Sequence, residues 1–153
     1  MKNSVFSFLL VMLFAPVVHA QMIDESQVPD AVRAVAHEQN KGKKVSMWSM
    51  PKTKDKYVAS FIDATDVRMI DISLEGKWIC TRNGIKPENM PEAVMTAAKA
   101  AAKEKFHKRY ELFNYFYVTG PEEAPYYMIN ASPKKDMNFI ALFFDPSGKP
   151  LNK

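Results

Sequence analysis

The chain has 153 residues, a formal net charge of +4, 47% hydrophobic residues and a single cysteine. A chain of this length forms one domain or two very small ones. One cysteine excludes an intramolecular disulfide, so a packed core must hold the fold together. The modest positive charge does not indicate a nucleic-acid partner.

Residues 1–20 have the features of a secretory signal peptide. A short positive start precedes an apolar run, and Val18 and Ala20 are the small or medium residues expected before a cleavage point at Gln21. The run is short for a membrane span, and Pro16 interrupts it. We therefore predict cleavage after Ala20, a periplasmic or secreted location and no stable membrane anchor.

The first half of the remaining chain predicts a helix followed by four strands. Apolar residues from Val28 to Ala36 recur at spacings of three and four, which is typical of one helical stripe. Pro29 and Asp30 suit the first turn of a helix, and Gly42 is a plausible stop. The expected order is a polar lead-in at residues 22–27, this helix, and strands at residues 44–50, 57–62, 67–74 and 77–81.

The second half of the chain repeats this order. "VPDAV" at residues 28–32 nearly matches "MPEAV" at residues 90–94, and "LEGKW" at residues 74–78 matches "PSGKP" at residues 146–150. The expected elements are a helix at residues 90–106, strands at residues 109–118, 126–131 and 137–144, and a short final strand. The predicted fold class is α+β, with two tandem helix-plus-antiparallel-sheet repeats (α-β-β-β-β each) at residues 21–84 and 85–153, together one domain.

The order of short motifs resembles that of the PepSY-like, β-lactamase-inhibitor-like (BLIP-like) secreted proteins of Bacteroidetes. The motifs are Val28-Pro29, Val45 with Trp48, Tyr57 with Phe61, and Gly76-Lys77-Trp78, and a second copy begins at Met90-Pro91. This second copy departs from the pattern at Pro150, where the first has Trp78. The resemblance implies similarity to inhibitors that press a sheet face and hairpin loops onto an enzyme. It does not specify a β-lactamase as the target.

The sequence contains no constellation of residues that indicates catalysis or metal binding. His37 and His107 lack metal-ligand spacing, and there is neither a glycine-rich phosphate loop nor a nucleophile elbow. The acidic pairs at residues 63–66 and 122–123 could serve acid–base chemistry or calcium binding, but turn chemistry and solvated loops explain them better. We therefore expect no enzymatic activity, no cofactor and no metal.

A lysine cluster and the cysteine each allow two interpretations. The lysines around the first hairpin are Lys41, Lys43, Lys44, Lys52, Lys54 and Lys56. They could bind an anionic polymer or an acidic protein, but a solvated surface that protects sheet edges is the better explanation. Cys80 is expected to be a buried small hydrophobe and not a reactive thiol.

Aromatic residues are dense in the expected strands. A helix on one face of an antiparallel sheet leaves the other face to water, to the second repeat or to a partner. Strict alternation would place Phe113, Tyr115 and Tyr117 on one face, and Asn114 and Phe116 on the other. Exposed aromatics on a sheet make good binding hot spots, although core packing is the alternative. The candidate protein-binding residues are Trp48, Tyr57, Trp78, Phe113, Tyr115, Tyr117 and Tyr127.

Together these features favour a secreted, non-enzymatic protein-binding module with an inhibitor-like mode of action. It would engage an unidentified periplasmic or extracellular protein, and no nucleic acid, through a sheet face and the loops at residues 51–56 and 119–125. The alternative is a carrier of a small ligand or lipid, or an envelope sensor, with a pocket between the repeats.

Overall fold

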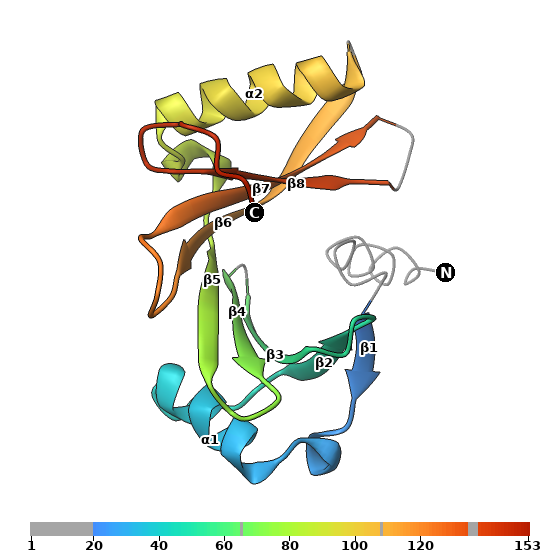
Figure 1. The fold of residues 1–153 in the computed structure, drawn as a ribbon, viewed down its shortest axis with the longest axis vertical. Coiled ribbons are helices and arrows are strands. Elements are labelled where there is room, and N and C mark those ends of the chain that lie inside the picture. The colour runs from blue at the N-terminus through green and yellow to red at the C-terminus, as the bar shows by residue number, and fades with distance from the viewer. Residues whose placement is uncertain (1–19, 65, 108, 135–137) are drawn as a thin grey trace, which may run out of the picture.

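The computed structural model describes residues 20–64, 66–107, 109–134 and 138–153. Apart from Ala20, the predicted signal peptide lies outside the described residues. The elements are β1 (Ala20–Ile23), the 3-10 turn η2 (Glu25–Gln27), α1 (Asp30–Gln39), β2 (Met47–Pro51), β3 (Lys56–Asp63), β4 (Asp66–Ser73), β5 (Trp78–Gly84), the 3-10 turn η3 (Pro87–Asn89), α2 (Glu92–Phe106), β6 (Tyr110–Thr119), β7 (Tyr126–Pro133) and β8 (Ile140–Phe144) (Figure 1).

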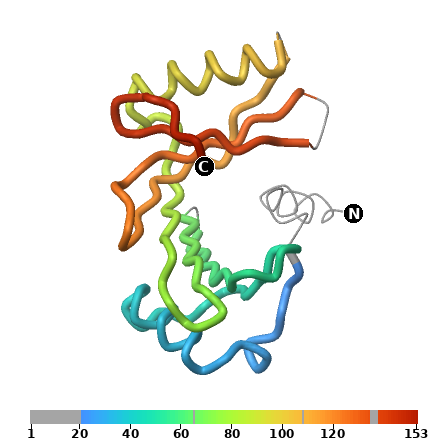
Figure 2. The backbone as a smooth tube through the Cα atoms, viewed as in Figure 1, coloured from blue at the N-terminus to red at the C-terminus, as the bar shows by residue number. Residues whose placement is uncertain are grey.

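The strands form one antiparallel sheet of eight strands, in the order β1 to β8. The α+β class is therefore confirmed, because two helices accompany this sheet. Figure 1 shows α1 and α2 at opposite ends of the molecule, with the sheet between them. The chain crosses from the first half to the second along β5 (Figure 2), and β5 pairs with β6 from Thr81–Thr119 to Gly84–Phe116.

Helix α1 forms where its apolar stripe predicts, although it is shorter at its C-terminal end. Val32 and Ala36 are fully buried, and they pack in one core cluster with Ile70 on β4. The helix ends at Gln39, and the backbone N–H of Gly42 donates to the carbonyl oxygen of His37 at 2.8 Å. Gly42 has a φ of 77°, a conformation that glycine adopts without strain at the end of a helix.

Helix α2 packs through a row of small side chains. Val94, Ala98 and Ala102 are fully buried and recur every four residues, so they lie on one side of the helix. The short alanine side chains allow the helix to lie close to the sheet, where Ile129 and Phe144 complete a second core cluster. The two helices therefore cover separate parts of the sheet with separate cores.

Both helices lie on the same face of the sheet. Residues directly opposite one another in an antiparallel pair point to the same side. A continuous row of such pairs runs through Phe61, Arg68, Asn83, Tyr117 and Tyr127. Its first residue belongs to the core under α1, and its last packs against the core under α2. We call this side the helix face and the other side the opposite face.

Two strand predictions were wrong at the ends of the chain. The expected polar lead-in contains β1, an exposed edge strand whose Met22 is 66% exposed, so its sequence carries no buried alternation. The expected fourth strand of the second half is absent from the described residues after β8, where Pro150 makes only an isolated bridge to Phe144. Proline has no N–H to donate, so it cannot extend a ladder of hydrogen bonds.

The strict alternation expected in β6 was also wrong. Phe113 lies opposite Asn130, but Tyr115 lies opposite Ile129, so Asn114 is an extra residue in the ladder. Asn114 has a φ of 51°, which is typical of a bulge residue. The bulge places Phe113 and Tyr115 on different faces, whereas regular alternation would have kept them together.

The two glycine-lysine turns make matched contacts with the two helices. A Cβ atom added at Gly76 would lie 3.0 Å from Cβ of Ala31 in α1, and one added at Gly148 would lie 2.6 Å from the carbonyl oxygen of Ala93 in α2. Both glycines have φ near 80°, so close approach and backbone conformation favour glycine at each turn. Ala31 and Ala93 hold equivalent places in the two similar helix starts, although the internal duplication itself stays a prediction.

Candidate protein-binding groove

Six of the seven sequence-predicted aromatics lie on the helix face. Tyr117 and Tyr127 form a tilted ring pair at 5.3 Å, and Trp48 is a core residue with 4% exposure. The partly buried Tyr57 and Trp78 pack against the core under α1, and Tyr115 and Tyr127 pack against the core under α2. Large aromatic side chains contribute most when they are buried, and on this face Trp48 is buried while the other five are partly buried. The proposed protein-binding role of these residues stays a prediction.

Phe113 is the one predicted site residue on the opposite face. It lies opposite Asn130 and makes an edge-to-face contact with Phe139 at 5.9 Å between ring centroids. The structure therefore does not bring the seven predicted residues together as one surface.

The opposite face differs in chemistry from the helix face. Buried polar residues on its strands are Ser49, Ser60, Asp71, Asn130 and Ser132, whereas its buried apolar residues are Val58, Phe116 and Val118. Buried polar groups cost free energy unless they are hydrogen-bonded or paired. A face with this composition is less well suited to core packing than the helix face.

A groove of about 620 Å³ lies on this opposite face, where the two halves of the sheet meet. It is lined by β4 and β5 on one side and by the β6–β7 loop, β7 and β8 on the other. We call it the β5 groove. Its apolar and aromatic lining comes from Ile79, Tyr126, Met128 and Phe143, and Trp78 borders it from the start of β5 while its side chain packs against the core under α1. Tyr126 and Phe143 meet edge to face at 6.1 Å, and Ile79 is 42% exposed.

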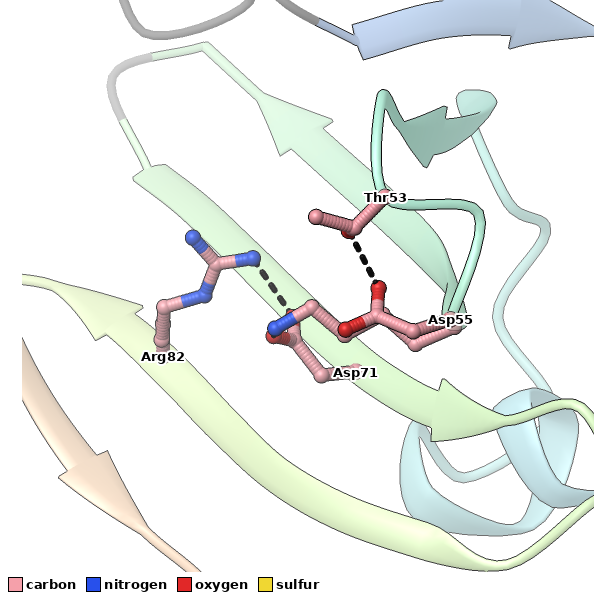
Figure 3. Close-up of polar contacts among 5 residues, drawn as sticks. Thr53, Asp55, Asp71 and Arg82 are labelled. Carbon is pink, nitrogen blue, oxygen red and sulfur yellow. Dashed lines mark hydrogen bonds and ion pairs between the residues drawn. The ribbon is translucent and has the colours of Figure 1, made fainter.

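An ion network lies among the groove-lining residues. Asp71 on β4 pairs with Lys56 Nζ at 2.8 Å and with the Arg82 guanidinium at 2.5 Å. Figure 3 shows Arg82 reaching from β5 toward Asp71, beside the hydrogen bond from Thr53 to Asp55 in the β2–β3 loop. The Asp71 side chain is 3% exposed, so its charge depends on these two partners instead of on water.

The network carries one more positive than negative charge. Lys56 and Arg82 share a single carboxylate, and their side chains keep 33% and 19% exposure. The Nε atom of Arg82 is buried and has no hydrogen-bond partner among the described residues. An arginine offers five N–H donors, so one carboxylate leaves part of this side chain available to an acceptor.

Cys80 and Tyr126 line the same groove and stay protonated at neutral pH. Burial, and next the negative charge of Asp71, raise the pKa of the Cys80 thiol to about 11. Burial is also the main cause that raises the pKa of Tyr126. A thiol that stays protonated is a poor nucleophile, which agrees with the expectation that Cys80 is not reactive, although it is half-buried and not fully enclosed.

The rim of the groove carries charges of both signs. Lys153 pairs with Glu123 and lies 4.0 Å above the ring of Tyr126, so the end of the chain is held against the β6–β7 loop. Glu75 and Glu122 are exposed rim residues. The rim is therefore not a uniformly basic or acidic surface.

Sequence reasoning did not identify Asp71 and Arg82 as a site. The available signal was a carboxylate in the middle of the apolar run "VRMIDISL" at residues 67–74, since a charge within a buried strand requires a partner. Lys56 belonged to the predicted solvated lysine cluster, but the structure separates it from the others by pairing it with Asp71. The remaining lysines of that cluster are exposed.

The described residues contain no group of three His, Cys, Asp or Glu side chains that could hold a metal ion. None of the described helices is both long enough and apolar enough to cross a membrane. Neither finding identifies an activity, so the arrangement of the opposite face carries the functional argument.

No family model and no curated protein matches this chain. Several solved structures share its fold. A proposed periplasmic protein of Bacteroides eggerthii DSM 20697 is 21% identical, with a TM-score of 0.62. The match covers 82% of this chain and 86% of that chain. A DUF2874 family protein of Bacteroides uniformis ATCC 8492 is 17% identical, with a TM-score of 0.62 and coverage of 81% and 86%.

A BLIP-like protein of Bacteroides fragilis NCTC 9343 is 16% identical, with a TM-score of 0.56 and coverage of 81% of this chain and 83% of that chain. The resemblance to BLIP-like proteins is therefore confirmed at the level of the fold. At this identity a shared fold does not transfer a target or a site.

Proposed function

We propose that this protein is a periplasmic or secreted, non-enzymatic module that binds another protein through the opposite face of its sheet. The observation that carries the proposal is the β5 groove, where half-buried aromatic and apolar side chains surround a charged network on the side away from both helices. Aromatic residues and arginine are the usual hot spots of protein interfaces. The BLIP-like and periplasmic descriptions of the structural neighbours support the same class of function.

Three hairpin connections border the proposed surface at one end of the sheet. Lys56 pairs with Ser73, which places the β2–β3 loop at residues 52–55 beside the β4–β5 turn at residues 74–77. Gly120 lies against Ile79 at the start of β5, so the β6–β7 loop borders the same end. A sheet face with loops at its border can enclose a protruding segment of a partner, as in an inhibitor-like mode.

Site-specific photocrosslinking tests this function. p-Benzoylphenylalanine replaces Tyr126 in the groove or, as a control, the exposed Lys99 on α2. After irradiation in envelope extract of the host, we expect a discrete crosslinked protein with the probe at position 126 and none with the probe at position 99. Crosslinking from both positions alike, or from neither, contradicts the proposal.

A matched pair of neighbouring tyrosines then separates binding from folding. Tyr126 lies on the opposite face and Tyr127 on the helix face, because consecutive residues of a strand point to opposite sides. With the crosslinker placed at Phe143, we expect Tyr126→Ala to reduce capture of the partner and Tyr127→Ala to reduce thermal stability while capture persists. The reverse pattern would place the binding surface on the helix face, where six of the seven predicted residues lie.

The carrier of a small ligand or lipid is a second candidate, favoured by the volume of the groove. About 620 Å³ lies within the range of pockets that bind small molecules. Native mass spectrometry of protein purified from its host would show a retained mass if the groove carries a ligand. A clean mass of the protein alone favours the protein-binding function.

We also propose that the two halves derive from one repeated unit. The support is the pair of matched contacts, Gly76 with Ala31 and Gly148 with Ala93, together with one helix and one core cluster in each half. The test is independent folding, with residues 21–84 expressed alone. If the fragment unfolds cooperatively, the first half is a structural unit that folds by itself, as a repeated unit would. If the fragment is unfolded, the first half is not an independently stable unit.

A further inference from the structure

The positive and negative charges of the ion network in the β5 groove do not balance. Two cations face one buried carboxylate, and Arg82 retains a buried Nε–H without a partner among the described residues. Buried donors of this kind normally find an acceptor, because an unmade hydrogen bond costs free energy. An acceptor that reaches the exposed part of Arg82 or Lys56 would pair with a free donor, and an anionic acceptor would also balance the charge of this three-residue network.

The rim restricts which anions fit. The exposed Glu75, Lys77 and Glu122 lie at the edge of the groove, and Glu123 is paired with Lys153. A polyanion such as a nucleic acid or an acidic polymer would bring many negative charges against these carboxylates. A single carboxylate on an otherwise apolar segment avoids this repulsion, because only its own charge enters the groove.

The aromatic lining favours an apolar neighbour beside that carboxylate. Tyr126 and Phe143 present rings on the β7 and β8 side, with Lys153 over the Tyr126 ring, while Ile79 lies on the β5 side. A side chain inserted between these walls would bury apolar area near Arg82. A carboxylate next to an apolar side chain therefore matches both parts of the groove.

Resting on the protein-binding function proposed above, we infer that the β5 groove accepts one Asp or Glu side chain of the partner protein, with an apolar residue beside it. The carboxylate accepts from Arg82 and Lys56, and the apolar residue lies against Tyr126 and Phe143. Charge-assisted hydrogen bonds from a guanidinium are shorter and stronger than neutral ones, and their planar geometry selects a carboxylate over an amide.

A matched pair of dipeptides tests this inference by NMR. N-acetyl-Glu-Phe-amide and N-acetyl-Gln-Phe-amide differ only in the charge and acceptor capacity of one side chain. The arginine Nε–H signals of ¹⁵N-labelled protein are followed, and the signal of Arg82 is assigned by its loss in Arg82→Lys. We expect the Glu peptide to shift the Arg82 signal and to bind about tenfold more tightly than the Gln peptide.

Two arginine variants provide the controls. Arg82→Lys keeps a positive charge beside Asp71 but removes the planar donors, so we expect about tenfold weaker binding of the Glu peptide without unfolding. Arg68→Gln changes another partly buried arginine whose Nε also lacks a partner among the described residues, outside the groove, and we expect unchanged binding. Equal binding of the two dipeptides, no binding of either, or indifference to Arg82→Lys overturns the inference.

Two further comparisons separate this inference from related ideas. Sodium acetate at the same concentration tests the carboxylate alone, and binding as tight as that of the Glu peptide would assign the groove to small free anions and overturn the protein-derived carboxylate. Repeating the photocrosslinking at position 126 in the Arg82→Lys variant separates the two proposals. Undiminished capture would overturn the carboxylate inference while the protein-binding function stands. If the unaltered protein captures no partner, the protein-binding function is refuted together with the inference that rests on it, even where the Glu dipeptide binds.

Discussion

The two faces of the sheet use aromatic residues in different ways. On the helix face, Trp48 and Phe144 are almost fully buried beneath α1 and α2. On the opposite face Phe116 is buried, whereas Tyr126 and Phe143 keep partial exposure and lie beside a charged network. An abundance of aromatics therefore does not by itself locate a binding surface, because core packing uses the same residues. Polar residues within strands are the better indicator here.

The polar residues support the same contrast. Asp71, buried on the opposite face, is paired with two cations, whereas the neighbouring Ile70 and Ile72 are fully buried in the core under α1. Natural proteins retain such a network only where something offsets its desolvation. The offset can be a partner, which is the basis of the function proposed for this face.

The largest effect is expected from a pair of neighbouring phenylalanines on β8. Phe144→Ala removes a side chain with 1% exposure from the core under α2, and we expect a loss of about 3–5 kcal/mol in the free energy of unfolding. Phe143→Ala acts on the partly exposed groove, and we expect a loss of about 1–2 kcal/mol. Equilibrium urea denaturation followed by tryptophan fluorescence measures both, and equal losses would contradict the difference between the faces.

The next effect is expected in the ion network. Asp71→Asn leaves Lys56 and Arg82 beside a neutral amide, and we expect a loss of about 1–3 kcal/mol, since the partial exposure of both cations moderates the cost of a buried unpaired charge. The control is Asp30→Asn, which removes an exposed pair with Arg33 and should change stability by about 0.5 kcal/mol or less. A similar small change in both variants would show that Asp71 is not held by its partners.

A smaller effect is expected at the bulge that assigns the β6 residues to their faces. Asn114→Val places a β-branched residue at a φ of 51°, and we expect a loss of about 1–2 kcal/mol. Asn114→Gly should be tolerated, because glycine adopts this conformation without strain. If Asn114→Val were as stable as Asn114→Gly, the backbone at residue 114 would not need the bulge conformation. The assignment of Phe113 and Tyr115 to different faces would then need revision.

The smallest effect is expected away from both faces, in the turn after β8. The Asp145 carboxylate accepts from the Ser147 hydroxyl at 2.6 Å and from the backbone N–H of Lys149 at 3.0 Å, and these hydrogen bonds lower its pKa from 3.8. A lowered folded-state pKa contributes stability above pH 3.8 that is lost as the pH falls through the folded value.

The stability difference between the unaltered protein and Asp145→Asn should therefore be present at neutral pH and disappear under strongly acidic conditions. Thermal unfolding measured from neutral to acidic pH checks this dependence. A difference that grows as the pH falls would contradict the sign of the pKa shift.

Much of the fold could be predicted because the local signals agree with it. The near-identical helix starts at Pro29 and Pro91 are followed by helices, and alternating segments such as residues 57–62 form strands. Failures occurred where local pattern carries little information. The edge strand β1 buries no regular set of side chains, and Pro150 replaces a strand by an isolated bridge.

The candidate site could be predicted only in part. The loops at residues 51–56 and 119–125 contribute Lys56 and the β6–β7 side of the groove, but six of the seven candidate aromatics lie on the helix face. Their individual residue types were compatible with either a core or an interface. The decision required knowing which face each strand turns toward the helices.

By itself the sequence determined the order of the two helices and of strands β2 to β8, the α+β class and a fold without disulfides, because helical periodicity, turn residues and cysteine number act locally or as totals. The tertiary structure decided which residues share a face. One extra residue at Asn114 reverses the orientation of every later side chain in β6, and pairing across β4, β5, β6 and β7 brings Asp71, Arg82 and Tyr126 into one groove. Such placement depends on the register between strands, which no single segment of sequence encodes.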